Sequence, residues 1–242
     1  MDGSLPSAAR VSLWTIALDG EPEPHEIALL PADERWRAGE IVVPAVRRRF
    51  VRARAAMRRV LGRRLGVAPH ALAFSYGANG KPSLAEHPAL HFNLSHSGEL
   101  AVLALSEDGE VGVDLESVRH RSQVLPVALR FFADDEAAAV AQAEGAAQVA
   151  IFLRTWTRKE AVLKATGRGM GVDTRAIAVG ATACAPRVRV DFDPRDLLLC
   201  DLELGPDYLG ALCVAPADRG RHAVAARIEG HLAPGHAPAT SP

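Results

Sequence analysis

The sequence predicts an α+β protein that is built from two lobes of similar size. The chain has 242 residues, of which 48% are hydrophobic, and this length allows a sizeable core in one large domain or two small ones. Each half contains helical patterns together with short strand patterns that turn residues separate. Each half therefore offers helices and a small, mainly antiparallel sheet, which is typical of an α+β architecture.

The first half opens with a predicted strand at residues 11–18 and continues to a long helix that begins near Pro44. Proline suits the first turn of a helix, and Gly66 suits the position just past its end. An apolar stripe follows one face of this helix, and arginines follow the other faces. The stripe consists of Val46, Phe50, Met57, Val60, Leu61 and Leu65, and the arginines are Arg47, Arg48, Arg49, Arg52, Arg54, Arg58, Arg59, Arg63 and Arg64.

Strands dominate the rest of the first half. A turn at Gly80-Lys81-Pro82 precedes a predicted strand at residues 91–94. The next two apolar segments, residues 101–105 and 111–115, are expected to form a hairpin around Asp108-Gly109.

The second half begins with helices and ends with strands. We expect helices at residues 124–132, 135–144 and 147–166, with Gly145 and Gly167 at the ends of the last two. Short strands are predicted at residues 176–179, 187–192, 197–202 and 209–214, with a last strand near residues 222–228.

These elements predict where the lobes divide. We place the boundary near Ser117, so that residues 1–117 form the N-terminal lobe and residues 118–229 the C-terminal lobe. Residues 230–242, which are rich in Pro, Ala and Gly, are expected to form a disordered tail.

Composition excludes several classes of protein. The formal net charge is −1, so no overall field attracts the chain to nucleic acid or to an anionic membrane. Cys184, Cys200 and Cys213 are odd in number and lack metal-site spacing, which argues against a disulfide framework or a zinc site. No apolar run approaches a membrane span and no signal peptide begins the chain. We expect a soluble protein of the cytoplasm.

Two acidic residues share one face of a predicted strand. In the segment Val111-Gly112-Val113-Asp114-Leu115-Glu116 the three aliphatic side chains alternate with Asp114 and Glu116, so the two carboxylates project together, with Cα atoms about 7 Å apart. Like charges in this position raise each other's pKa or need a cation between them, and paired oxygen ligands suit magnesium. A solvated strand end is an equally good interpretation of these two residues alone.

A third carboxylate, Glu160, lies within the apolar stripe of the predicted helix at residues 147–166. A carboxylate in such a stripe is costly unless it is paired or bound to a metal. Lys164 follows one turn later, so an ordinary Glu-to-Lys helix pair is the alternative. Together the three acids would give magnesium three protein ligands and leave its other positions for water and phosphate oxygens, which predicts a phosphate-bearing substrate.

Other polar motifs are weaker when taken singly. Lys81, His96 and the arginines could hold phosphates through charge-assisted hydrogen bonds, although each alone is more typical of a surface or loop residue. A Ser-His hydrolase is disfavoured because Ser95 and His96 are adjacent and no G-x-S-x-G is present. The glycine-rich residues 167–171 follow a helix rather than opening one, and the arginine helix lacks the interleaved aromatic residues of a nucleic-acid surface.

The motifs taken in order resemble a known family. They are Gly80-Lys81-Pro82, Phe92-Asn93-Leu94-Ser95-His96-Ser97, residues 111–116, and Trp156-Thr157-Arg158-Lys159-Glu160-Ala161 with Lys164. Their order, over residues 30–179, resembles the larger, monomeric class of phosphopantetheinyl transferases, which activates peptide, polyketide and sometimes fatty-acid synthases. The resemblance implies two α+β lobes arranged as a pseudo-dimer, with coenzyme A in the cleft between them.

The resemblance also implies roles for individual residues. Asp114, Glu116 and Glu160 match the magnesium ligands, and Lys164 matches a lysine that contacts the coenzyme A phosphates. Among the other matches, His96 corresponds to a ligand of the ribose phosphate, and Arg37 and Arg54 match by pattern only. The residues that match coenzyme-binding positions are Lys81, Ser95, His96, Lys159, Arg37 and Arg54. Residues 131–136 resemble a segment that borders the carrier-protein surface, whereas Ala161-Val162 depart from the aromatic residues frequent there.

The activity implied is transfer of the 4'-phosphopantetheine arm of coenzyme A to a serine of an acyl or peptidyl carrier protein, with release of adenosine 3',5'-bisphosphate. Magnesium and Lys164 would stabilise the charge on the phosphate oxygens. Glu160 is the favoured base for the serine proton, with Glu116 or a metal-bound water as alternatives. The alternative function is a non-catalytic module that binds a nucleotide or a carrier protein. No nucleic-acid or membrane partner is expected.

Overall fold

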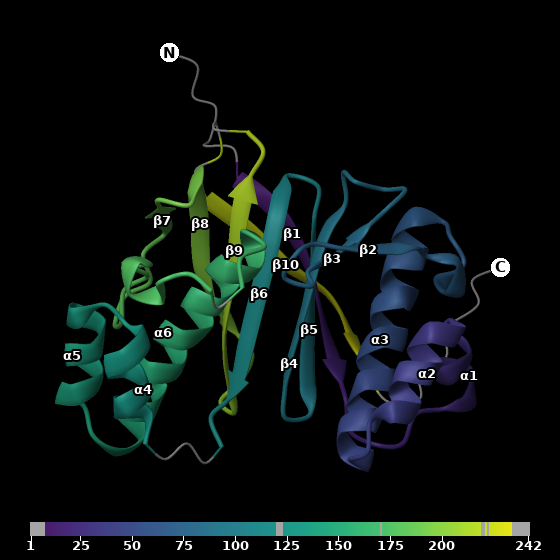
Figure 1. Cartoon of the computed structure of the whole chain (residues 1–242), viewed down its shortest axis with the longest axis horizontal. Helices are drawn as coiled ribbons and strands as arrows, with labels where there is room; N and C mark the ends of the chain where they lie inside the picture. Colours follow the sequence, from purple (N-terminus) through teal and green to yellow (C-terminus); the bar gives the residue numbers. More distant parts are fainter. Residues whose placement is uncertain (1–7, 120–122, 170, 219–220, 222, 234–242) are drawn as a thin grey trace.

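The computed structural model describes residues 8–119, 123–169, 171–218, 221 and 223–233. Two sheets lie back to back in the middle of the molecule, and helices cover the outer face of each (Figure 1). Helix α3 packs on one sheet and helix α6 on the other. Helices α1 and α2 pack against α3, and α4 and α5 pack against α6. The predicted α+β class is therefore confirmed.

The long helix begins and ends at the residues that the sequence predicts. Helix α3 begins with Pro44 in its first turn and ends at Gly66, whose φ of 68° lies in the left-handed region that favours glycine. The helices are α1 Pro24–Ala28, α2 Ala32–Glu40, α3 Pro44–Leu65, α4 Val124–Phe131, α5 Asp134–Gln142 and α6 Gly145–Ala165, with short 3-10 turns at Pro69–Ala71 and Thr174–Ala176.

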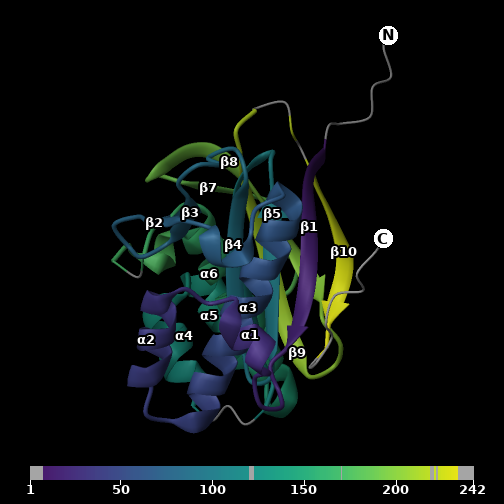
Figure 2. The same ribbon diagram turned by 90° about the vertical axis from the view of Figure 1, so that its right-hand side faces the viewer.

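The first sheet has the strand order β10-β1-β5-β4, in which β1 and β10 are parallel and the other pairs antiparallel. Figure 2 shows β1 and β10 side by side at one edge of this sheet. A separate small hairpin joins β2 and β3. The strands are β1 Ala8–Ala17, β2 Phe74–Tyr76, β3 Pro82–Leu84, β4 His91–Ser97, β5 Leu100–Ser106 and β10 Ala223–Leu232.

The second sheet has the order β6-β9-β8-β7 and is antiparallel throughout. Its strands are β6 Gly109–Ser117, β7 Arg187–Val190, β8 Asp193–Glu203 and β9 Tyr208–Pro216. In β6 the side chains of Val111, Val113 and Leu115 face the other sheet, where they enter a shared core of aliphatic residues. The alternate residues of β6, which include Asp114, point toward α6.

Strand β5 has two apolar faces, and its central position explains why the predicted pairing of residues 101–105 with residues 111–115 is wrong. Leu103 and Leu105 pack under α3, whereas Val102 and Ala104 pack against the second sheet. The strand is therefore central, with β1 and β4 as its neighbours, and β6 pairs with β9 instead. The predicted hairpin around Asp108-Gly109 is not formed, although both of its strands exist.

Two smaller expectations also need correction. Residues 176–179 were expected to form a strand, but Thr174–Ala176 form a 3-10 turn. The ammonium of Lys159 donates to Thr174 O in this turn and to Ile177 O just after it. Strand β10 continues through Leu232, past the predicted start of the tail at residue 230, because pairing with β1 extends that far. Residues 222 and 234–242 lie outside the described residues.

The two sheets exchange strands across the predicted lobe boundary. Strand β6 precedes residue 117 but pairs in the second sheet, and β10 follows the second sheet in sequence but pairs with β1 in the first. A division of the chain at residue 117 stays a prediction. In the part of the chain that the structure describes, no helix is long and apolar enough to cross a membrane.

Candidate active site

The candidate site lies where β4 and β6, one edge strand from each sheet, meet. These strands run in the same direction and are linked through side chains rather than through a backbone ladder. The amide of Val113 donates to Asn93 Oδ1 at 2.9 Å, and Ser95 Oγ donates to Asp114 Oδ1 at 2.9 Å. This seam brings the serines of β4 against the predicted metal ligands of β6 while it covers two sheet edges.

Glu116 is held by the same seam. Ser97 Oγ donates to Glu116 Oε2 at 2.8 Å and itself accepts from the amide of Ser117 at 3.1 Å. Ser97 was not among the predicted site residues. The alternation of Asn93, Ser95 and Ser97 on one face of a strand is the signal that could have identified it.

Helix α6 approaches β6 closely because of Gly112. A Cβ atom at Gly112 would lie 2.2 Å from Ala161 O and 2.2 Å from Ala165 N, so only glycine fits. Ala161 and Ala165 are themselves small and fully buried. This backbone contact places the last two turns of α6, with Glu160 and Lys164, over the acidic face of β6.

Lys164 joins the two strands at the centre of the site. Its Nζ donates to Asp114 Oδ1 at 2.6 Å, to Ser95 Oγ at 2.9 Å and to Val113 O at 3.2 Å. Asp114 is only 6% exposed, so its charge is stabilised by this ammonium and by the serine. Its second oxygen, Oδ2, is buried without a hydrogen-bond partner.

Glu160 completes the acidic group. Burial raises the pKa of Glu160, and the negative charges of Asp114 and Glu116 raise it further, whereas Lys164 opposes them. The three acids therefore influence one another electrostatically. With the side chains as they lie, however, no group of three or more His, Cys, Asp or Glu among the described residues is arranged to hold a metal ion.

The donor set still fits a hard cation in two respects. The unpartnered Asp114 Oδ2 is a buried oxygen that needs a donor or a cation. Burial and the nearby charges of Asp114 and Glu116 raise the pKa of Glu160, and a cation among these carboxylates would oppose that rise. Three carboxylates are the ligand type that magnesium prefers. To hold one ion together, these side chains would have to rotate from the positions they occupy here.

His96 lies on the opposite face of β4, toward α3. Partial burial, together with the positive charges of Lys164 and Arg49, lowers the pKa of His96. Arg49 reaches this place from α3 and donates to Glu99 Oε1 at 2.5 Å. Arg49 was not a predicted site residue, because nothing in the sequence distinguishes it from the other arginines of the same helix.

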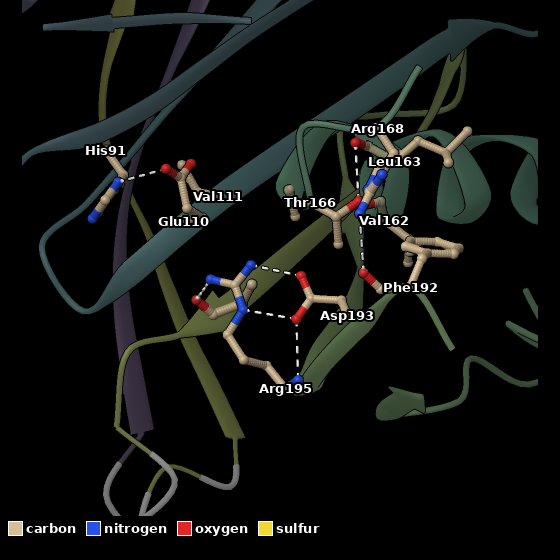
Figure 3. A network of polar contacts seen from close by, with 12 residues as sticks. His91, Glu110, Val111, Val162, Leu163, Thr166, Arg168, Phe192, Asp193 and Arg195 are labelled. Atoms are coloured by element: carbon tan, nitrogen blue, oxygen red, sulfur yellow. Dashed lines mark hydrogen bonds and ion pairs between the residues drawn. The ribbon is translucent and has the colours of Figure 1, made fainter. Parts of the chain in front are cut away.

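Lys81 is near the site but is already bonded. Its Nζ donates to Glu110 Oε2 at 2.5 Å and to two backbone carbonyls. Figure 3 shows the second partner of Glu110, His91, whose Nδ1 lies 3.2 Å from Oε1. Although burial opposes ionisation, the hydrogen bonds from His91 and Lys81 lower the pKa of Glu110 to about 2.

Three other predicted residues are not brought to this group. Lys159 is 3% exposed and is held against α5 and the 3-10 turn by Glu136 at 2.7 Å and by Thr174 O at 2.9 Å. Arg54 pairs with the buried carboxylate of Glu34. Arg37 is exposed, with its guanidinium 5.5 Å from the ring centroid of Phe50.

A pocket of about 240 Å³ opens between the β2–β3 turn and the end of α6. It adjoins the cluster because Lys164 and Asn93 line it. Its lining is Asn79, Gly80, Lys81, Pro82, Asn93, Leu94, Leu163, Lys164, Gly167 and Arg168.

Comparison with known proteins assigns both parts of the chain to one family. Residues 110–213 match the model of the 4'-phosphopantetheinyl transferase superfamily, and residues 22–108 match the N-terminal domain model of 4'-phosphopantetheinyl transferases. The chain is 38% identical over 216 residues to the 4'-phosphopantetheinyl transferase HetI of Nostoc sp., covering 87% of this chain and 89% of that protein. It is also 38% identical over 160 residues, 65% of each chain, to a putative 4'-phosphopantetheinyl transferase of Synechocystis sp..

A third relative is the L-aminoadipate-semialdehyde dehydrogenase-phosphopantetheinyl transferase of Eremothecium gossypii, 36% identical over 166 residues, which are 64% of this chain and 57% of that protein. The α+β fold and the acidic cluster beside the contact of β4 with β6 are consistent with these matches. The chain belongs to the 4'-phosphopantetheinyl transferase superfamily, in its larger class.

Proposed function

We propose that the chain transfers the 4'-phosphopantetheine arm from coenzyme A to a serine of an acyl or peptidyl carrier protein and releases adenosine 3',5'-bisphosphate. Membership of the family supports phosphopantetheinyl transfer to carrier proteins. The observation that carries the proposal is the cluster in which Lys164 bridges Ser95 and Asp114, with Glu160 near enough for its pKa to respond to the charges of Asp114 and Lys164.

The reaction forms one bond and breaks one. The serine oxygen of the carrier bonds to the phosphorus that carries the arm, and the bond from that phosphorus to the adenosine bisphosphate breaks. Catalysis of this kind depends on positioning and on stabilising charge at phosphate oxygens. An enzyme nucleophile is not required, and burial raises the pKa of Cys184 to about 11 and of Cys200 to about 12, so both thiols stay protonated near neutral pH.

Lys164 and Ser95 are proposed to face the diphosphate of coenzyme A, and His96, on the other face of β4, is proposed to bind its ribose phosphate. Lys164 is the one of the three that carries a full positive charge, and its side chain is 28% exposed, so it can turn from Asp114 to a phosphate oxygen. Arg49 adds positive charge beside His96. These residues would stabilise the leaving group as negative charge develops on it.

Glu160 is the proposed base. A carboxylate whose pKa is raised toward the working pH accepts a proton more readily than an ordinary one. Its place on α6, one turn before Lys164, lets both residues act on the same reacting group. Glu116 is the alternative base.

Asp114, Glu116 and Glu160 are the residues proposed to hold magnesium. When bound, the ion would neutralise charge on the diphosphate oxygens. Asp114 would offer its unpartnered Oδ2, which needs no existing hydrogen bond to be broken. Ser95 and Ser97 would keep the two β6 carboxylates oriented.

Intact-mass analysis of an apo carrier protein tests the proposal. The chain is incubated with coenzyme A and magnesium, and the carrier is expected to gain the mass of one phosphopantetheine, which a serine-to-alanine carrier should not gain. A chain that only binds nucleotide or carrier would leave the mass unchanged. We further propose a monomer that works in the cytoplasm, which light scattering and cell fractionation can test.

A further inference from the structure

The turn between β2 and β3 contacts the C-terminal end of α6, although more than 80 residues separate them in sequence. Lys81 Nζ donates to Ala165 O at 3.2 Å, and Asn79 Nδ2 donates to Gly167 O at 2.9 Å. The last carbonyls of a helix lack intrahelical partners and carry partial negative charge. An ammonium and an amide from the first lobe thus satisfy the end of a helix in the second.

The ammonium of Lys81 has no donor left for another ligand. An ammonium has three N–H groups, and those of Lys81 meet Glu110 Oε2 at 2.5 Å, Val111 O at 3.1 Å and Ala165 O at 3.2 Å. The side chain is 16% exposed and Glu110 keeps its negative charge, since its pKa is lowered to about 2. To reach a phosphate, Lys81 would have to break its ion pair with Glu110 and its hydrogen bonds to two backbone carbonyls at the same time.

The point of contact is next to the reacting groups. Ala165 directly follows Lys164, and its amide nitrogen lies where a Cβ on Gly112 would collide. Val111 O, the third acceptor, belongs to β6, three residues before Asp114. Lys81 therefore ties the end of α6 to the strand that carries two of the acids.

We propose that Lys81 is a positioning residue, which fixes the last turn of α6 and with it Lys164 against β6, and does not bind coenzyme A phosphate. This replaces the phosphate-binding role that the sequence predicts for Lys81. The contact stands on the structure alone, whereas its effect on turnover rests on the proposed function.

Steady-state kinetics with coenzyme A and an apo carrier separate the two roles. For Lys81→Met we expect kcat to fall by about 10-fold to 100-fold, the range for residues that orient a primary ligand, while KM for coenzyme A stays within about 3-fold. Titration calorimetry with adenosine 3',5'-bisphosphate should show nearly unchanged affinity. A phosphate-binding lysine would instead weaken that affinity and raise KM by at least about 10-fold.

Glu110→Gln provides a second variant in case Lys81→Met does not fold. It keeps the shape of the side chain, removes the charge that holds Lys81, and should lower kcat in the same way but less. The matched control is Arg189→Met, which removes a cation from a pair with Asp196 in which the Arg189 side chain is 82% exposed. This control should leave kcat and KM unchanged.

Amide hydrogen exchange gives a readout that does not depend on transfer. In Lys81→Met, exchange should rise in peptides that cover residues 162–168 and stay unchanged in α4 and α5. If wild-type chain transfers nothing, the proposed function fails while this exchange result still supports the contact. Unchanged exchange at residues 162–168, or a rise in KM with unchanged kcat, would overturn the positioning role.

Discussion

Lys81, Lys159 and Lys164 are the only lysines of the sequence, and each ammonium meets three acceptors. Their surroundings nevertheless differ. Lys159 is buried inside the second lobe, Lys81 ties a turn to a helix end, and Lys164 alone meets an acid of the cluster. Residue type and motif therefore predicted a site near these lysines, but only the fold separates Lys164, which contacts the acidic cluster, from the two lysines that are bonded elsewhere.

The arginines of α3 show the same limit of sequence reasoning. The helix and its basic faces were predicted, yet the acids that pair with these arginines lie far away in sequence. Arg58 is 2% exposed and pairs with Glu34, and Arg52 is as deeply buried beside Glu26. Such partners come together only through tertiary packing, so a surface for phosphates could not be distinguished from a set of internal ion pairs.

Asp114→Ala should abolish most transfer and leave the fold intact. The change removes an acceptor of both Lys164 and Ser95, as well as the free oxygen offered to the metal. We expect a loss of about 100-fold or more in transfer rate, measured by carrier mass, with an unchanged circular dichroism spectrum. Glu107→Ala, at an exposed pair with Arg64, is the control and should keep full activity. Full activity in Asp114→Ala would remove this residue from the site.

Glu34→Ala should destabilise the protein strongly. Glu34 receives hydrogen bonds from Arg58 at 2.8 and 2.9 Å and also pairs with Arg54, so its removal leaves a buried guanidinium without its counter-charge. Breaking a buried pair in this way costs about 3 kcal/mol, to be measured by urea unfolding near neutral pH. Glu21→Ala, whose carboxylate is 83% exposed beside Arg48, should change the free energy of unfolding little.

The effect of Glu34→Ala should also depend on pH. Burial raises the pKa of Glu34, but the hydrogen bonds from Arg58 and Arg54 outweigh it, so the pKa lies below its usual 4.5. Such a group contributes its full stability above the unfolded-state pKa and loses it as the pH falls through the lower folded-state value. The gap between wild type and variant should therefore shrink on acidification below about pH 4.5. A gap that widens in acid would contradict this assignment.

At the level of elements, local signals predicted helices better than pairings. Proline and glycine marked the ends of α3, and apolar spacing marked its buried face, because these signals act within one helix. Strand pairing depends on which edges are free, and the sequence favoured the neighbouring strand for residues 111–115. Strand β6 pairs with β9 rather than with β5, because both edges of β5 are paired with β1 and β4.

Gly112→Ala tests how closely α6 must approach β6. The added Cβ would meet the backbone of Ala161 and Ala165 at 2.2 Å, so the helix must shift and move Glu160 and Lys164 with it. We expect a loss of about 1 to 3 kcal/mol in unfolding free energy and a lower kcat. Gly39→Ala, in α2 with nothing within 4 Å of the new atom, should be neutral or slightly stabilising. Equal effects of the two substitutions would show that the close contact is unimportant.

At the scale of the whole molecule, the sequence predicted the kinds of element in each half but not the core that the two sheets share. Two lobes with helices and small sheets follow from the sequence, but the exchange of β6 and β10 between the halves does not. Val111 and Val113 of β6 share a core with Val11 and Leu13 of β1, so neither sheet buries its inner face without the other. Long-range packing of this kind leaves no local pattern in the sequence.

Deletion of residues 217–242 should prevent the chain from folding as a monodisperse species. The shortened chain lacks β10, so the backbone edge of β1 is exposed. It also lacks Val224, which packs against the core between the sheets. We expect aggregation in size-exclusion chromatography, whereas deletion of residues 234–242, which removes none of the described strand pairs, should leave the elution volume nearly unchanged. A folded, active product of the longer deletion would contradict the role of β10.

The pairing of β1 with β10 has a consequence for biosynthesis. Strand β1 is synthesised before the other described strands and β10 after them, so one edge of β1 stays without its partner until β10 has been made. Until then its open side can be shielded only by a chaperone or by non-native contacts, because domains fold as units when their segments emerge. A translation pause after β9 and before β10 should therefore leave the edge of β1 open for longer and increase misfolding of the nascent chain.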